Sequence, residues 1–166
     1  MRVLNSNGLG AMGFALPAAI GGCIASGRRR TISIDGDGGF QLNIQELETL
    51  ARLKLPIKLF VLNNQGYASI RSSQRAYFKG RYAGSDPSSG LTLPDTLRVA
   101  RAYGLKTMRI ANHAGLRAGV RKALSSRGPV VCEVIGHKDQ ATAPRVSSFQ
   151  RPDGTMVSRP MEDLSP

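Results

Sequence analysis

The sequence predicts an α/β fold, a doubly wound parallel sheet with helices on both faces. Short apolar runs with a β-branched bias alternate along the chain with longer helical stretches, which is the pattern of βαβ units. The run at 57–62 is almost entirely apolar, as expected for a strand that is covered on both faces. A glycine-rich turn and an amide-rich turn follow the first two runs, and such folds bind their ligands at the carboxyl ends of strands.

The first 30 residues predict a turn and a buried helix. Residues 1–10 end in a glycine-rich turn, and residues 11–26 carry many small side chains that allow close packing. Pro17 is expected either to kink this helix or to begin its regular part, because proline lacks an N–H donor. Gly27 is a plausible helix end, since glycine accepts the left-handed conformation that closes many helices.

The following segments alternate strand and helix up to a long loop. Residues 31–34 and 57–62 predict strands, and residues 43–53 and 67–77 predict helices, the first of which has one apolar face. Residues 79–94 are rich in Gly, Ser, Asp and Pro. A loop of this length in a compact domain indicates function or mobility.

The last elements complete the predicted sheet. Helices at 94–103 and 113–125 alternate with strands at 106–110 and 130–135. The alternation of strands and helices therefore predicts one domain over residues 1–136. Residues 137–166 are polar, and we expect a tail that packs on another surface or stays loose.

The composition limits the classes of partner. The chain has 166 residues, enough for one complete core, and a formal net charge of +12. Such a charge would suit nucleic acid or an anionic membrane. The basic residues are scattered, however, and only 5% of residues are aromatic, so we predict no nucleic-acid partner. The apolar stretch 11–25 contains glycines and is too short to span a bilayer, so we predict no membrane partner.

The cysteines indicate a reducing compartment. Cys23 and Cys132 both lie among apolar residues, which predicts buried free thiols rather than a disulfide. No pattern of a secretory signal peptide is visible at the start of the sequence. The cytoplasm is therefore the expected location.

Two turns carry the candidate chemistry. Residues 36–39 read GDGG after the first strand, and residues 63–66 read NNQG after the second. A crossover helix returns the chain to its starting edge, so both turns are expected at the same edge of the sheet. Each turn alone is more often a simple connection than a site. The 24 residues between Gly38 and Asn63, the length of one helix and one strand, favour a shared function of the two turns.

The residue types in these turns suit a magnesium ion that holds a diphosphate. Mg²⁺ prefers six oxygens, with one or two carboxylates and substrate phosphates among them. Asp37 would supply the carboxylate, Asn64 its side-chain carbonyl, and Gly66 its main-chain carbonyl. Gly38 and Gly39 would offer main-chain N–H groups to the phosphate.

These motifs resemble those of thiamine-diphosphate-dependent enzymes. Gly36-Asp37-Gly38, 24 residues and then Asn63-Asn64 resembles their cofactor motif, and the upstream GLGAMGFALPAAIG at 8–21 is similar to the acetolactate synthase and pyruvate oxidase branch. The resemblance covers about residues 5–135. It implies thiamine diphosphate and Mg²⁺ as cofactors, with Asp37, Asn64 and Gly66 as the metal ligands. The cofactor-binding positions that it implies are Gly10, Met12, Gly36, Asp37, Gly38, Gly39, Asn64, Gly66 and Tyr67.

The resemblance also implies a partner. Enzymes of this family use a glutamate that protonates the aminopyrimidine, and it lies in a separate pyrimidine-binding domain, often of the other subunit. Glu46 and Glu48, on the predicted helix 43–53, are no substitute and do not share a helix face. We therefore expect a fragment or a split subunit with no catalytic residue of its own, inactive alone, that forms a homo-oligomer with its active site at an interface.

The substrate class implied is a 2-oxoacid, which the family decarboxylates or ligates to an acceptor as a lyase or transferase. The resemblance implies Met and Trp in acetolactate synthases at the positions of Ser69 and Ser73, where they would line the substrate pocket. The chain has no Trp. Gly39 replaces a hydroxyl residue that is frequent in the family. A related lyase or carboligase, with another 2-oxoacid or a sugar-like acyl donor, is therefore at least as well supported as acetolactate synthesis itself.

Other hypotheses remain open at this point. A catalytically inactive cofactor-binding or interaction module would keep the same motifs. A nicotinamide-dependent dehydrogenase has a similar sheet, but no clear strand leads into Gly8, Gly10 and Gly13. Tyr67 and Arg71 either line the pocket or pack at a helix start.

Overall fold

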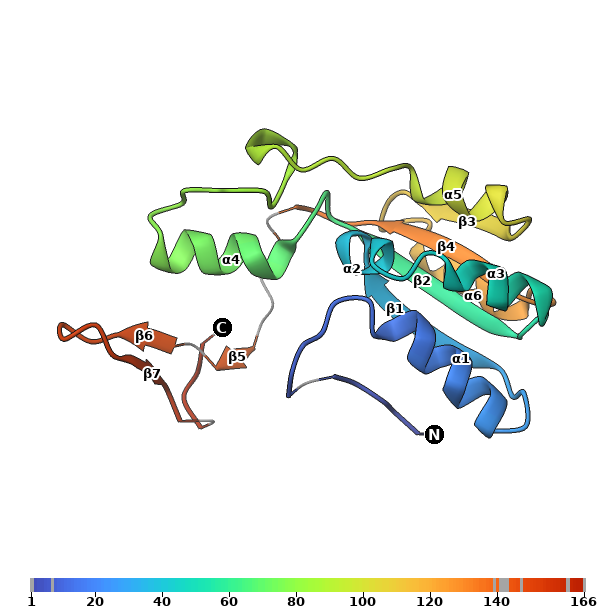
Figure 1. Cartoon of the computed structure of the whole chain (residues 1–166), viewed down its shortest axis with the longest axis horizontal. Coiled ribbons are helices and arrows are strands. Elements are labelled where there is room, and N and C mark those ends of the chain that lie inside the picture. The colour runs from blue at the N-terminus through green and yellow to red at the C-terminus, as the bar shows by residue number, and fades with distance from the viewer. Residues whose placement is uncertain are drawn as a thin grey trace.

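The centre of the molecule is a four-stranded parallel sheet (Figure 1). The computed structural model describes residues 2–6, 8–138, 140, 144–146, 148–160 and 162–165. The sheet has the order β1-β2-β4-β3, with β1 (Thr31–Gly36), β2 (Ile57–Asn63), β3 (Lys106–Ile110) and β4 (Val130–Ile135). The predicted parallel sheet is confirmed, and β1 continues two residues further than predicted, through Asp35 and Gly36.

In the described part of the chain, six α-helices and one 3₁₀ helix lie before and between the strands of the sheet. They are α1 (Ala15–Ala25), α2 (Asp37–Gln41), α3 (Glu46–Arg52), α4 (Ala68–Tyr77), η1 (Pro87–Ser89), α5 (Thr96–Ala102) and α6 (Leu116–Ser125). Pro17 lies in the first turn of α1, where its missing N–H would have no partner inside the helix in any case. Gly27, with φ +74°, follows the end of α1 as predicted.

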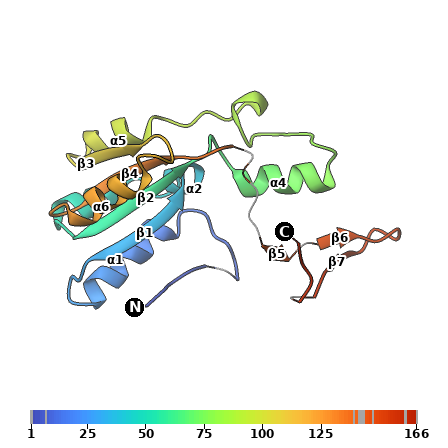
Figure 2. The same cartoon turned by 180° about the vertical axis from the view of Figure 1, so that it is seen from behind.

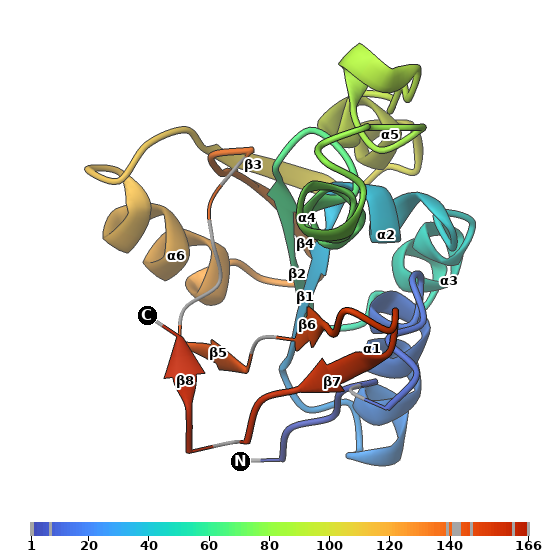
Figure 3. The ribbon, with the colours of Figure 1, turned by 90° about the vertical axis from the view of Figure 1, so that its left-hand side faces the viewer.

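The topology places helices on both faces of the sheet. The chain moves in one direction from β1 to β2 and past β4 to β3, and then returns to β4. Right-handed crossovers put the helices before and after such a reversal on opposite faces. Accordingly, α1, α2 and α3 cover one face and α6 covers the other (Figure 3). The doubly wound fold predicted from the sequence is thus confirmed.

Strand β2 lies at the centre of both hydrophobic layers. Ile57, Leu59 and Val61 are fully buried against the layer that contains α1 and α3. Phe60 points to the other face and packs with Ala123 of α6. This alternation follows from the two-residue period of a strand.

Both cysteines are free and buried, as predicted. Cys132 lies in the layer under α6. Burial raises the pKa of the Cys132 thiol to about 11, and the charge of the neighbouring Glu133 adds to the effect. The thiol therefore stays protonated at neutral pH and is a poor nucleophile.

The long loop between α4 and α5 is ordered by its own side chains. Asp86 caps η1 and accepts hydrogen bonds from Ser88 and Ser89. Gln74 of α4 bonds to Ala83 and Ser85 on the same loop. These bonds give the loop a defined conformation, and a function for it stays a prediction.

The segment after β4 contains two short antiparallel pairs. They are β5 (Arg145–Val146) with β8 (Leu164–Ser165), and β6 (Ser148–Gln150) with β7 (Met156–Ser158). Figures 1 and 2 show α4, β5, β6 and β7 beyond the carboxyl ends of the sheet. The division into a domain at 1–136 and a tail at 137–166 stays a prediction. In the ranges described, no helix is both long and apolar enough to cross a membrane.

Candidate functional site

The two polar turns meet at the carboxyl edge of the sheet. The parallel register pairs Gly36 of β1 with Leu62 of β2, so both strands end side by side. Asp37 opens α2 and is only 3% exposed. Its Oδ1 accepts the N–H of Gly38 at 3.0 Å, and its Oδ2 accepts the N–H of Gly66 at 3.0 Å. The juxtaposition that the sequence predicts is therefore present.

Close approach of the two turns explains the glycines. A Cβ on Gly38 would lie 2.4 Å from the ring of Tyr67 and 3.5 Å from the carbonyl oxygen of Gly66. Tyr67 is therefore packed against the first turn. A Cβ on Gly39 would meet Oδ1 of Asp35 at 2.4 Å. These positions admit only glycine unless the neighbouring side chain moves.

The two adjacent asparagines have different roles. The Asn63 side chain donates from Nδ2 to Glu133 Oε1 at 2.7 Å and accepts the N–H of Gln65 at 3.1 Å. The Asn64 Oδ1 atom is buried and has no hydrogen-bond donor. A buried acceptor without a partner costs free energy, which a bound cation would recover. Asn63 thus anchors the turn, whereas the Asn64 side chain fits a metal ion.

Burial makes the carboxylates of this edge costly to ionise. It raises the pKa of Asp37, although main-chain N–H groups, that of Gly66 first, act in the opposite direction. Burial also raises the pKa of Asp35, whose Oδ2 has no partner. Among the described residues no group of three or more His, Cys, Asp or Glu side chains surrounds a common point. A metal here would therefore need amide, main-chain and ligand oxygens, as Mg²⁺ with a diphosphate does.

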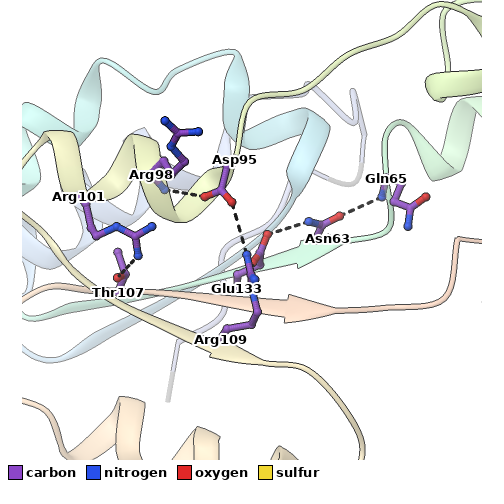
Figure 4. A network of polar contacts seen from close by, with 8 residues as sticks. All are labelled: Asn63, Gln65, Asp95, Arg98, Arg101, Thr107, Arg109 and Glu133. Carbon is purple, nitrogen blue, oxygen red and sulfur yellow. Dashed lines mark hydrogen bonds and ion pairs between the residues drawn. The ribbon is translucent and has the colours of Figure 1, made fainter.

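A polar network around the buried Glu133 supports this edge from the other side of β2 (Figure 4). Glu133 of β4 is 1% exposed, and its Oε2 lies 2.6 Å from Arg109 Nε. Arg109 also pairs with Asp95 at 3.5 Å, and Asp95 caps α5 through the Arg98 N–H. The network thus joins β2, β4, β3 and α5 through charged hydrogen bonds.

Comparison with known proteins decides the family. The model of the family described as "Thiamine pyrophosphate enzyme, C-terminal TPP binding domain" matches residues 1–134. The chain belongs to this family. Thiamine pyrophosphate (TPP) is the same compound as thiamine diphosphate, so the resemblance in the motifs is confirmed at the level of the family.

Relatives of this TPP-binding domain include acetolactate synthases. The chain is 40% identical over 132 residues to the acetolactate synthase large subunit of Cyanidium caldarium, covering 80% of this chain and 22% of the relative. It is 36% identical over 149 residues to the chloroplastic acetolactate synthase 2 of Nicotiana tabacum, covering 87% and 22%. It is 35% identical over 146 residues to the acetolactate synthase of Arthrospira platensis, covering 88% of this chain and 25% of the relative. The chain thus spans about a quarter of the length of these relatives.

Two predicted contacts of the TPP-binding domain belong to neither of the two turns. Gly10, with φ +60°, and Met12, 38% exposed, belong to the segment before α1. Within the described ranges no hydrogen bond links either residue to the two turns. The nearby Gly13 is tied to Asn43, after α2, by a bond from the Asn43 amide to its carbonyl. Contact of Gly10 and Met12 with the aminopyrimidine stays a prediction.

The remaining candidates are distributed along α4. Ser69 and Ser73 are exposed, and the Ser73 hydroxyl donates to the Ser69 carbonyl at 3.2 Å. Arg71 is buried under the turn of residues 64–66. Of the two alternatives left open for Arg71, the structure supports packing at the helix start.

The network around Glu133 yields a prediction about stability. Changing Glu133 to glutamine keeps the bond to Asn63 and removes the charge, so we expect a loss of about 1–2 kcal/mol in the free energy of unfolding. Changing Arg109 to methionine leaves a buried carboxylate without its cation, so we expect the larger loss of the two. Urea unfolding of both variants measures this order. A larger loss in Glu133→Gln would contradict it.

Proposed function

We propose that the chain binds thiamine diphosphate through Mg²⁺ held between the two turns. The protein ligands are the Asp37 carboxylate, the Asn64 side-chain oxygen and the Gly66 main-chain oxygen. The observation that carries this proposal is the buried Asn64 Oδ1 without a donor, beside a carboxylate that is 3% exposed. A diphosphate and water would complete the six oxygens that Mg²⁺ prefers.

Main-chain N–H groups would hold the diphosphate. Gly36, Gly38 and Gly39 belong to the turn that enters α2. A Cβ on Gly36 would meet no atom within 4 Å, so this side of the turn is open to a ligand. The N–H groups of Gly36 and Gly38 donate here to the carboxylates of Asp35 and Asp37, and phosphate oxygens would replace these carboxylates as acceptors. When bound, the cofactor supplies the electron sink for reactions of carbonyl compounds.

We infer that the chain is part of an acetolactate-synthase-like enzyme that decarboxylates or ligates a 2-oxoacid. The acetolactate synthases among its relatives support this class. The exposed Ser69 and Ser73 on α4 favour a pocket different from one lined by Met and Trp. The dehydrogenase hypothesis has no support in the family match. The cytoplasmic location stays a prediction, since the tobacco relative is named as chloroplastic.

Catalysis would need a partner that carries the activating glutamate. We propose a pyrimidine-binding domain, in a homo-oligomer with the site at an interface. Strand β1 is an edge of the sheet, and Ile32 and Ile34 on it are 52% and 62% exposed. Phe14 and Ile24 of the neighbouring α1 region are also exposed. Apolar surface of this kind favours a contact with another domain. Without such a partner the chain would act only as a cofactor-binding module.

Calorimetric titration of the chain with TPP tests the proposed function. We expect heat of binding in the presence of Mg²⁺ and none in the presence of a chelator, because the diphosphate reaches the carboxylate only through the metal. A second titration adds a pyrimidine-domain protein of the family. Equal heat with Mg²⁺ and with chelator would refute the proposal. So would the absence of heat both for the chain alone and for the chain with the pyrimidine-domain protein.

A further inference from the structure

Arg71 of α4 is a buried side chain that contacts four main-chain carbonyls. It is 2% exposed. Nη1 donates to the carbonyl oxygens of Ser85 at 3.1 Å and Gln65 at 3.4 Å. Nη2 donates to those of Asn64 at 2.9 Å and Lys138 at 2.7 Å. These bonds join the turn after β2, the loop before α5 and the segment after β4.

The turn that Arg71 contacts has an unfavourable backbone. Gln65 has φ +64°, a left-handed conformation that a residue other than glycine keeps only where the surroundings enforce it, and the next residue, Gly66, has φ +129°. The Ser85 carbonyl also accepts the N–H of Tyr67 at 2.9 Å, so Arg71 fixes both sides of the turn. Only the planar arginine fork offers enough donors for such a set of acceptors.

The consequence concerns the proposed metal ligands. Arg71 binds the main-chain carbonyl of Asn64 and leaves its side-chain oxygen without a partner. The N–H of Gly66, two residues after Asn64, donates to the carboxylate of Asp37. The guanidinium thereby sets which oxygens of the turn remain available to a cation.

We propose that Arg71 is a positioning residue that holds residues 64–66 in the conformation that binds metal and diphosphate. The proposal rests on the proposed function. Arg71 contacts neither ligand and acts through the main chain. If its loss lets the turn leave this conformation, the apparent dissociation constant rises in inverse proportion to the fraction of chains that keep it.

Two readouts test this proposal on Arg71→Met. Amide hydrogen exchange at Gly66 and Tyr67 needs no ligand, and we expect it to become at least about tenfold faster as the turn opens locally. The dissociation constant for TPP with Mg²⁺ should rise at least about tenfold. Arg71→Lys keeps the charge but not the fork, so intermediate values are expected.

Lys58 provides the matched control. It is a buried cation at the opposite end of β2, 2% exposed, and donates to the carbonyls of Ser126 and Gly128. Lys58→Met should leave the Gly66 and Tyr67 amides and the TPP affinity within about twofold of wild type, because it acts far from the turn.

The outcomes separate this proposal from the proposed function. Unchanged exchange and affinity in Arg71→Met, or equal changes in Lys58→Met, would overturn the role of Arg71. Absence of Mg²⁺-dependent binding in the wild type would instead refute the proposed function, and with it the ligand role of the turn. Faster exchange and weaker binding confined to the Arg71 variants, with partial rescue by lysine, would support positioning.

Discussion

Replacing Asp37 with alanine is expected to abolish Mg²⁺-dependent binding of TPP, with a loss of affinity of about a hundredfold or more. Losing a partner outside the ligand shell already weakens metal sites by about 10–100-fold, and Asp37 is the proposed carboxylate ligand itself. It is also the acceptor that joins the two turns through the N–H groups of Gly38 and Gly66. Calorimetric titration with and without Mg²⁺ measures the loss.

Asp35 is the matched control for this prediction. It lies two residues earlier, near the end of β1, and burial raises its pKa as well. We expect Asp35→Asn to keep Mg²⁺-dependent binding within a few-fold of wild type. If Asp35→Asn lost as much affinity as Asp37→Ala, this would contradict the assignment of the metal to Asp37 rather than to Asp35.

The raised pKa of Asp37 gives binding a pH dependence. Because the metal needs the ionised carboxylate, affinity should fall as the pH drops through this raised pKa, above the ordinary 3.8. The metal-free chain responds with the opposite sign. The pKa of Asp37 is higher in the folded than in the unfolded chain, so Asp37 contributes stability at low pH. This contribution is lost as the pH rises from the ordinary pKa through the raised pKa of the folded state. Titrations and unfolding curves at a series of pH values measure both trends.

The fold was predictable because its two central strands, β2 and β4, are short and mostly apolar. Residues 57–62 pack on both faces of the sheet, so burial enforces what the local sequence prefers. The same holds for the strand at 130–135, whose bounds are those predicted. The two turns were also predictable, since parallel strands that are joined by a crossover end at one edge.

The supporting charges of the site were not predictable in the same way. Arg71 bonds to Lys138, 67 residues away, and Asn63 bonds to Glu133, 70 residues away. No local pattern specifies such partners, because they depend on which segments the topology brings together. The one available signal was Glu133 itself, a charge within the apolar strand at 130–135. A charge in a strand that is covered on both faces requires a buried partner.

Replacing Gly66 with alanine is expected to lower the free energy of unfolding by about 3 kcal/mol or more. Two costs add at this position. Its φ of +129° lies in a region that only glycine adopts without strain. A Cβ there would also meet the main-chain oxygen of Ser85 at 2.4 Å, and backbone cannot move aside as a flexible side chain does. Urea unfolding measures the loss.

Gly21 separates this site-specific cost from a general effect of adding a methyl group. It is an exposed residue of α1 with helical backbone, and its Cβ would meet no atom within 4 Å. Gly21→Ala is therefore expected to stabilise the chain by about 0.5–1 kcal/mol. If Gly66→Ala proved as harmless, the contact between the turn of residues 64–66 and the Ser85 loop would not exist in solution. The proposed metal ligands would then lack the support that fixes their position.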